Sequence, residues 1–143
     1  MDRRILLVAL AIITFIVGEP AFAARLIVSI TGVKNASGGV YIGLYATPSK
    51  FLNGTQVDLM KKVQATAGPI TVVFDNLPPG VYALGAYHDE NNNDHLDTNF
   101  IGLPEEGYAL SNGVRAVMSK PSFQQASFTI GTTDTPISLH IRY

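Results

Sequence analysis

The sequence predicts an all-β fold, a single antiparallel β-sandwich of about seven strands in the transthyretin-like or immunoglobulin-like manner. Short apolar runs alternate with polar residues at a period of two, which is typical of half-buried strands. Turn-forming Gly, Pro and Asn residues separate these runs at the spacing found in sandwiches. Beyond the N-terminal segment, no long stretch has the 3.6-residue period of a helix. A small barrel is the alternative architecture.

The N-terminal segment has the three parts of a secretory signal peptide. Arg3 and Arg4 precede an apolar run over residues 5–17, and Ala21 and Ala23 form a small-x-small cleavage site. The run of thirteen residues spans about 20 Å as a helix, less than the roughly 30 Å of a bilayer core. The pattern therefore predicts cleavage without permanent membrane insertion.

We expect cleavage after Ala23, with a cut after Ala24 as the alternative, and one domain over residues 24–143. The protein would then be exported by a bacterium and be periplasmic or secreted. The chain contains no Cys, so it has no lipid-attachment cysteine, disulfide or thiol nucleophile.

The charge of the chain argues against one class of partner. Removing residues 1–23 takes away two basic and two acidic residues, so the net charge stays at −1. No basic stripe is present in the remaining sequence, and we therefore expect no nucleic-acid binding.

The predicted strands follow one another closely along the first half of the chain. Most have one apolar face: Ile42 and Leu44 share a face of the second run, for example, while Tyr41, Gly43 and Tyr45 share the other. The last two runs form a predicted hairpin, and one short helical turn is expected over residues 47–54. The seven predicted strands cover residues 25–33, 38–46, 56–65, 69–77, 80–88, 125–131 and 135–143.

Residues 89–122 form a long irregular segment with several glycines and prolines. Connections of this length are uncommon inside compact domains and are usually functional or held by specific contacts. The segment begins with "DENNNDHLD", which is rich in side-chain oxygens.

This acidic stretch matches much of a calcium-binding loop. Counted from Asp89, side-chain oxygens fall at positions 1, 3, 5 and 9, on Asp89, Asn91, Asn93 and Asp97. His95, at position 7, would contribute its backbone carbonyl. Calcium takes six to eight oxygen ligands in flexible geometry, so the pattern predicts a weak, structural calcium site.

Two positions depart from the calcium-loop pattern. Position 6 is Asp94 instead of Gly, and position 12 is Phe100 instead of a bidentate Glu. Glu105 or Glu106 could supply the missing carboxylate. The alternative is an Asx-rich turn without an ion, because Asn and Asp side chains bond to nearby backbone and tolerate left-handed conformations.

A longer run around this loop resembles a known family. The motifs are "LPPGVY", "HDENNNDHLDTN" and "GLPEEGYALSN", followed by "PSFQQASF" at residues 121–128. Together they resemble the bacterial family DUF2141 over nearly all of residues 26–143. The resemblance implies an exported sandwich of the transthyretin-like or carboxypeptidase-regulatory-like type, and it implies no activity.

The sequence offers no recognisable catalytic motif, so we predict no catalytic residues. The leading hypothesis is a non-enzymatic binding or structural module whose partner is a cell-envelope protein, a glycan or a small ligand. Such a module could also pair with a partner through a strand edge. The alternative is a hydrolase in which His88 acts with the neighbouring carboxylates of Asp89 and Glu106.

Overall fold

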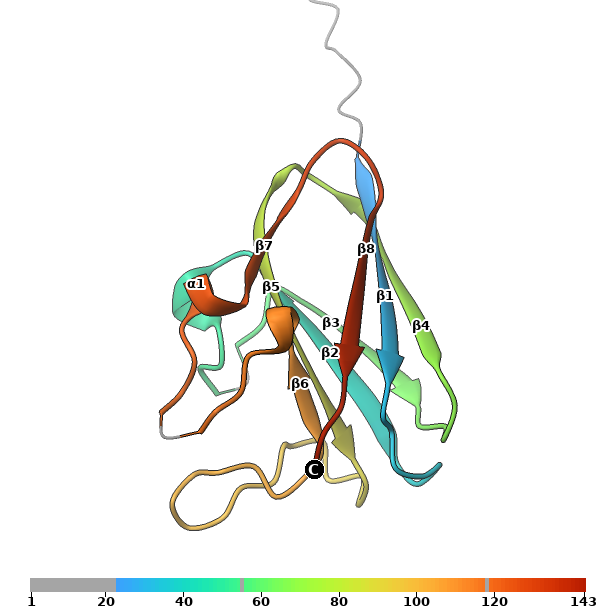
Figure 1. Cartoon of the computed structure of the whole chain (residues 1–143), viewed down its shortest axis with the longest axis vertical. Helices are drawn as coiled ribbons and strands as arrows, with labels where there is room; N and C mark the ends of the chain where they lie inside the picture. Colours follow the sequence, from blue (N-terminus) through green and yellow to red (C-terminus); the bar gives the residue numbers. More distant parts are fainter. Residues whose placement is uncertain (1–22, 55, 118) are drawn as a thin grey trace, which may run out of the picture.

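The computed structural model describes residues 23–143 except 55 and 118. All of the predicted signal peptide but Ala23 lies outside the described residues. The all-β prediction is confirmed, because two β-sheets hold nearly all of the regular secondary structure of the described chain (Figure 1). The strands are β1 (Ala24–Thr31), β2 (Gly39–Tyr45), β3 (Leu59–Gln64), β4 (Ile70–Leu77), β5 (Gly80–Asp89), β6 (Tyr108–Leu110), β7 (Ser127–Ile130) and β8 (Thr135–His140).

The smaller sheet has the strand order β4-β1-β8. β1 runs antiparallel to β4 but parallel to β8, with Leu26 opposite Thr135 and Ile30 opposite Leu139. The prediction of a wholly antiparallel fold is therefore wrong at this pair. Alternation of apolar residues sets the face of a strand but carries no information on the direction of its neighbour.

The larger sheet has the order β3-β2-β5-β6, and β7 pairs with β5 beyond the end of β6. The predicted hairpin of the last two strands is wrong, because β7 pairs with β5 whereas β8 pairs with β1 in the other sheet. The connection after β7 thus passes from one sheet to the other (Figure 1). β6 was not predicted, since its three residues are too few to show a period.

β5 changes partner halfway along its length. Residues 85–87 pair with β6 and residues 80–83 pair with β7, which leaves Leu84 between the two partners. The buried Ser111 hydroxyl fills this gap: Oγ accepts from the Leu84 N–H at 2.9 Å and lies 2.5 Å from the Ala126 carbonyl. A side chain therefore replaces a strand at this point and keeps the buried backbone group bonded.

The two sheets share one hydrophobic core. Alternate residues of β1 and β4 are buried, as the period of two predicts, and they pack with those of β2, β5 and β8. The alternation in the sequence predicts eight core residues, of which Phe128 is only partly buried and packs against the core. The other seven are all buried: Ile42, Leu44, Val72, Phe74, Leu84, Leu139 and Ile141.

A second, smaller cluster covers part of the opposite face of the larger sheet. Phe51 packs edge-on against Tyr45 and Phe123, with ring centroids 5.3 and 5.9 Å apart. Phe51 follows the predicted helical turn, which is a 3-10 turn, η1 (Pro48–Lys50). Phe123 begins a helical turn, α1 (Phe123–Ala126), where Ser122 and Gln125 form a capping box. The predicted strand over 125–131 is therefore wrong at its first two residues.

In the part of the chain that the structure describes, no helix is long and apolar enough to cross a membrane.

Candidate functional site

The loop after β5 is organised by the side chain of Asp89. Asp89 ends β5 and is fully buried. Its two carboxylate oxygens accept hydrogen bonds from the backbone N–H groups of Asn93 (3.1 Å) and Asp94 (2.9 Å). Asn92 and Asp94 have left-handed backbones, with φ of 58° and 64°. Asn and Asp tolerate this conformation better than most residues, so the loop turns tightly without glycine.

Two further carboxylates close the loop. Asp97 accepts from the side-chain amides of Asn91 (2.8 Å) and Asn93 (2.7 Å). The nearly buried Glu106 accepts from the backbone N–H groups of Glu90 and Asp97, both at 3.0 Å. The structure therefore brings together Asp89, Asn91, Asn93, Asp97 and Glu106 of the predicted calcium site.

The hydrogen bonds show what this arrangement can do chemically. Every oxygen of the three carboxylates accepts at least one bond from the loop itself. The amide nitrogens, not the oxygens, of Asn91 and Asn93 face Asp97, so a cation would require both amides to turn over. No group of three or more Asp, Glu, His or Cys that could hold a metal ion occurs among residues 23–143, with 55 and 118 left out.

Two other predicted members contact this arrangement through their backbones, with their side chains exposed. The side chain of His95 is exposed, and its backbone N–H donates to Asn93 Oδ1 at 3.0 Å. Glu105 is exposed, and its contact with the loop is a backbone bond from its N–H to the Asp97 carbonyl at 2.8 Å. Of the two glutamates considered, Glu106 is the one that reaches the loop with its carboxylate.

His88 lies on the core side of β5 and has no exposed surface. Its Nδ1 is 2.5 Å from the Tyr143 hydroxyl and its Nε2 is 2.7 Å from the Ser37 carbonyl. The imidazole thus ties the C-terminus and the residues before β2 to β5. Neither Asp89 nor Glu106 is a partner of this ring, although the hydrolase hypothesis joined all three residues.

A groove lies beside the loop, on the face of the larger sheet that points away from the core. Three tyrosines stand in one row across neighbouring strands, with Tyr41 opposite Tyr87 and Tyr87 opposite Tyr108. The rings of Tyr41 and Tyr87 stack with centroids 4.9 Å apart and planes 4° apart. Lys62 extends the row, with Nζ 4.7 Å from the centre of the Tyr41 ring.

The next row across the sheet contains two glycines. Gly43 of β2 lies opposite Gly85 of β5, and the row ends in Met60 on one side and Leu110 on the other. A pair of glycines on adjacent strands removes two side chains from the same place on the sheet. The groove passes over these two glycines, and the Tyr45 ring lies close beside them: a Cβ at Gly43 would lie 3.1 Å from Tyr45 Oη and 3.1 Å from Val57 Cγ2.

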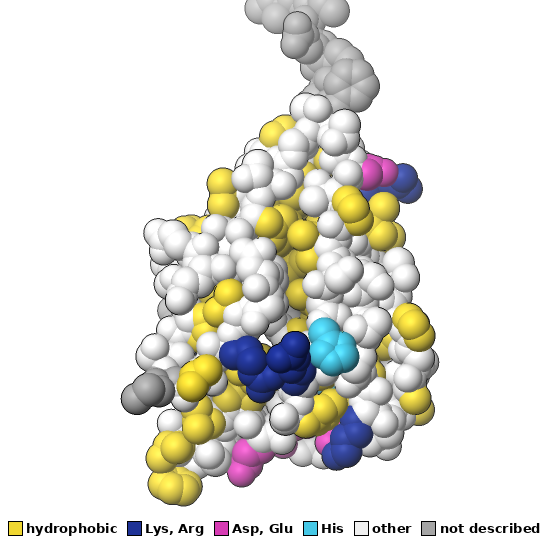
Figure 2. All heavy atoms as spheres, in the orientation of Figure 1, with side chains coloured by type: hydrophobic (Ala, Val, Ile, Leu, Met, Phe, Trp, Pro, Cys, Tyr) yellow, Lys and Arg dark blue, Asp and Glu magenta, His cyan; other side chains and the backbone are white. Residues whose placement is uncertain are grey.

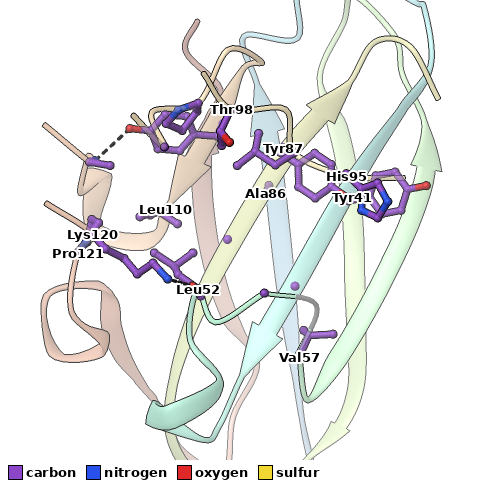
Figure 3. Close-up of a pocket in the computed structure, with 18 of the residues that line it drawn as sticks. Tyr41, Leu52, Val57, Ala86, Tyr87, His95, Thr98, Leu110, Lys120 and Pro121 are labelled. Carbon is purple, nitrogen blue, oxygen red and sulfur yellow. Dashed lines mark hydrogen bonds between the residues drawn. The ribbon is translucent and has the colours of Figure 1, made fainter. Parts of the chain in front are cut away.

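The groove has a volume of about 560 Å³, and three segments distant in sequence wall it: residues 52–54, 94–104 and 119–121. In Figure 3, Tyr41, Tyr87 and His95 lie at one end, and Leu52, Lys120 and Pro121 at the other. Residues 94–104 belong to the loop after β5 (residues 90–107, the acidic loop) and include the exposed Ile101. The loop predicted to bind calcium is therefore also a wall of this groove.

Asp94 joins the loop to the tyrosine row. Its carboxylate accepts from the Tyr41 hydroxyl and from Lys62 Nζ at 2.9 Å, and its carbonyl accepts from the Tyr87 hydroxyl at 3.3 Å. These bonds, from Tyr41 first and then from Lys62, lower the pKa of Asp94. Burial is the main reason that the pKa of Tyr87 is raised. At neutral pH, this end of the groove holds a neutral tyrosine pair and a compensated ion pair.

The sequence contains one signal for the groove, which the prediction of a strand over residues 38–46 did not use. Tyr41, Gly43 and Tyr45 were predicted to share the face of this strand opposite Ile42 and Leu44, and they do line the groove together. The hollow, however, depends on Gly43 meeting Gly85, and that register cannot be read from either strand alone.

Comparison with known proteins gives one family. The model of a family described as an uncharacterized protein conserved in bacteria (DUF2141) matches residues 28–138. No curated protein and no solved structure matches the chain.

Proposed function

The chain belongs to the DUF2141 family, and from its groove we propose that it is an exported, non-enzymatic β-sandwich module that binds a small, mainly apolar ligand. The observation that carries the proposal is the hollow at Gly43 and Gly85, lined by tyrosines and enclosed by the acidic loop. Its volume of about 560 Å³ lies within the roughly 300–1,000 Å³ of small-molecule sites.

The chemistry of the walls favours an apolar ligand over a glycan. Leu52, Val57, Leu103 and Pro104 contribute apolar surface, whereas most charged or hydroxyl groups already have partners within the protein. The Tyr108 hydroxyl, for example, accepts from the Ala116 N–H at 3.0 Å. A glycan needs many free donors and acceptors, while an apolar ligand with a ring needs mainly flat, apolar surface and a few polar groups.

A neutral fluorescent probe tests this proposal. We expect 1-N-phenylnaphthylamine to bind the purified protein with enhanced fluorescence. Gly85→Val should weaken binding about tenfold or more, because the new side chain fills the floor of the hollow, and tenfold corresponds to about 1.4 kcal/mol. The added Cβ would lie 3.3 Å from Leu110 Cδ2, the flexible end of a side chain, and 3.8 Å from Tyr45 Cε2, so a cooperative melting curve of the variant is measured first to establish that it folds.

Gly131→Val is the matched control. Gly131 follows β7, and a Cβ there meets nothing within 4 Å. This variant should bind the probe as the unchanged protein does. Equal probe affinity in the unchanged protein and in a folded Gly85→Val variant would contradict the proposal, as would an absence of probe binding.

Export and the sandwich architecture are supported by different observations. The signal-peptide pattern of residues 1–23 supports export, and β1 begins at Ala24, directly after the expected cleavage site. Two sheets that share one core support a β-sandwich rather than a closed barrel.

A structural calcium ion in the acidic loop is a second proposal. The observation in its favour is the chain of hydrogen bonds through the loop that links Asp89 to Asn93, Asn93 to Asp97 and Asp97 to Glu106, although these carboxylates form no ready-made metal group. The ion would stiffen one wall of the groove and take no part in chemistry. The hydrolase alternative has less support, because His88 is enclosed and lines neither the groove nor the second cavity described below.

A further inference from the structure

We propose a second binding site, for a phosphate or sulfate group, in the cavity between Arg115, His140 and Arg142. The cavity has a volume of about 130 Å³ and lies where the end of β8 meets β6. It is separate from the groove, and the two share only Tyr108 and Leu110 among their lining residues. The inference therefore stands independently of the proposed ligand of the groove.

Tyr108 contacts both arginines, one through its backbone and the other through its ring. The backbones of Tyr108 and Arg142 exchange two hydrogen bonds, of 3.0 and 3.1 Å. The guanidinium carbon of Arg115 lies 5.6 Å from the centre of the Tyr108 ring. Figure 2 shows a cationic patch of Lys or Arg side chains directly beside a histidine at this place.

The charges in this cavity are not compensated by the described residues. Four other cations form ion pairs, for example Arg25 with Asp134 at 2.5 Å and Lys50 with Asp58 at 2.6 Å. Neither Arg115 nor Arg142 has such a pair, and no carboxylate lines the cavity, in the part of the chain that the structure describes. An oxyanion in the cavity would give both guanidinium groups a partner.

The remaining lining residues add hydrogen-bond donors. His140 Nδ1 is 3.0 Å from the Thr31 hydroxyl, so Nε2 is the ring nitrogen that faces a ligand, and it donates when the ring carries a hydrogen there. Ser138 contributes a hydroxyl to the same cavity. Each guanidinium offers several N–H donors in one plane, which suits an oxyanion. A volume of about 130 Å³ holds one such group, either as a free ion or at the end of a larger molecule.

Calorimetric titration of the purified protein at constant ionic strength tests the site. Inorganic phosphate, sulfate and phenyl phosphate are the probes. We expect Arg115→Gln and Arg142→Gln each to weaken binding about tenfold or more, as for loss of a charge-assisted hydrogen bond. Arg115→Lys should fall between them and the unchanged protein, because lysine keeps the charge but loses the planar pair of donors.

Lys61→Gln is the matched control, since Lys61 is exposed on β3 and does not line the cavity. It should leave binding unchanged. Tighter binding of phenyl phosphate would assign the site to a phosphate group on a larger ligand, and equal binding of the two phosphates would assign it to the free anion. The proposal is overturned if no probe binds, or if Lys61→Gln weakens binding as much as the arginine variants do.

Discussion

Asp58 is the residue whose electrostatic contribution is most clearly defined. It precedes β3 and accepts hydrogen bonds from the backbone N–H groups of Ala46 (2.8 Å) and Thr47 (2.9 Å) and from Lys50 Nζ (2.6 Å). Burial alone would raise the pKa of this carboxyl, but the bonds outweigh that effect and lower the pKa from 3.8 to about 2. The ionised side chain therefore fastens the connection between β2 and β3.

Asp58→Asn should lower the free energy of unfolding by about 1 kcal/mol at pH 7, a value reduced for solvent screening. Because the folded-state pKa is the lower one, the contribution of Asp58 is present above its ordinary pKa of 3.8 and is lost as the pH falls towards 2. Urea unfolding at pH 7 and pH 2.5 measures this. Asp75→Asn, at an exposed carboxylate of β4, is the control. A difference between Asp58→Asn and the unchanged protein that is as large at pH 2.5 as at pH 7 would contradict the assignment.

At the scale of the element, the acidic loop is satisfied by its own hydrogen bonds and would gain a modest amount from an ion. At a calcium concentration ten times the dissociation constant, binding adds about 1.4 kcal/mol, enough to raise the melting temperature by several degrees. Melting curves in EDTA and in millimolar calcium, with magnesium for comparison, measure this shift. Asp97→Asn should abolish the calcium-dependent part, whereas Asp75→Asn should retain it. Coincident curves in EDTA and calcium would leave the loop as an Asx turn.

The elements show why some predictions from sequence succeeded and others did not. Ile70, Val72 and Phe74 alternate inward in β4 as predicted, because alternation alone decides which face a strand buries. The hairpin of β7 and β8 was wrong, since proximity in sequence favours pairing but the short connection leads to the other sheet. Helix α1 could have been found from its Ser122–Gln125 capping box, but its single turn is too short to show a helical period.

At the scale of the whole molecule, the loop residues of the candidate site were predictable and the groove was not. The Asp and Asn residues from Asp89 to Asp97 are close together in the sequence, so they are necessarily close in the structure. The groove depends on the register of β2 and β5 and on where residues 94–104 and 119–121 lie against the sheet, and both are set by tertiary packing. Arg115 and Arg142 likewise line one cavity only because Tyr108 of β6 bonds to Arg142.

The proposed export also concerns the molecule as a whole. We expect the protein recovered from the periplasm or medium of an expressing bacterium to begin at Ala24, or at Arg25 if cleavage follows Ala24. Intact-mass and N-terminal sequence measurements decide this. Ala23→Leu should slow processing, because the cleavage site requires a small residue, whereas Ala67→Leu, in an exposed turn between β3 and β4, should not. A cytoplasmic protein that still begins at Met1 would contradict export.

The parallel pairing of β1 with β8 has a consequence for how the chain reaches its final state. β1 is the middle strand of its sheet, and its parallel neighbour β8 follows all the other described strands in sequence. A ribosome therefore delivers β8 long after β1, and the smaller sheet cannot be complete until residues 135–140 have emerged. Contacts this remote in sequence slow folding. Under the proposed export, this delay would favour an unfolded chain during translocation.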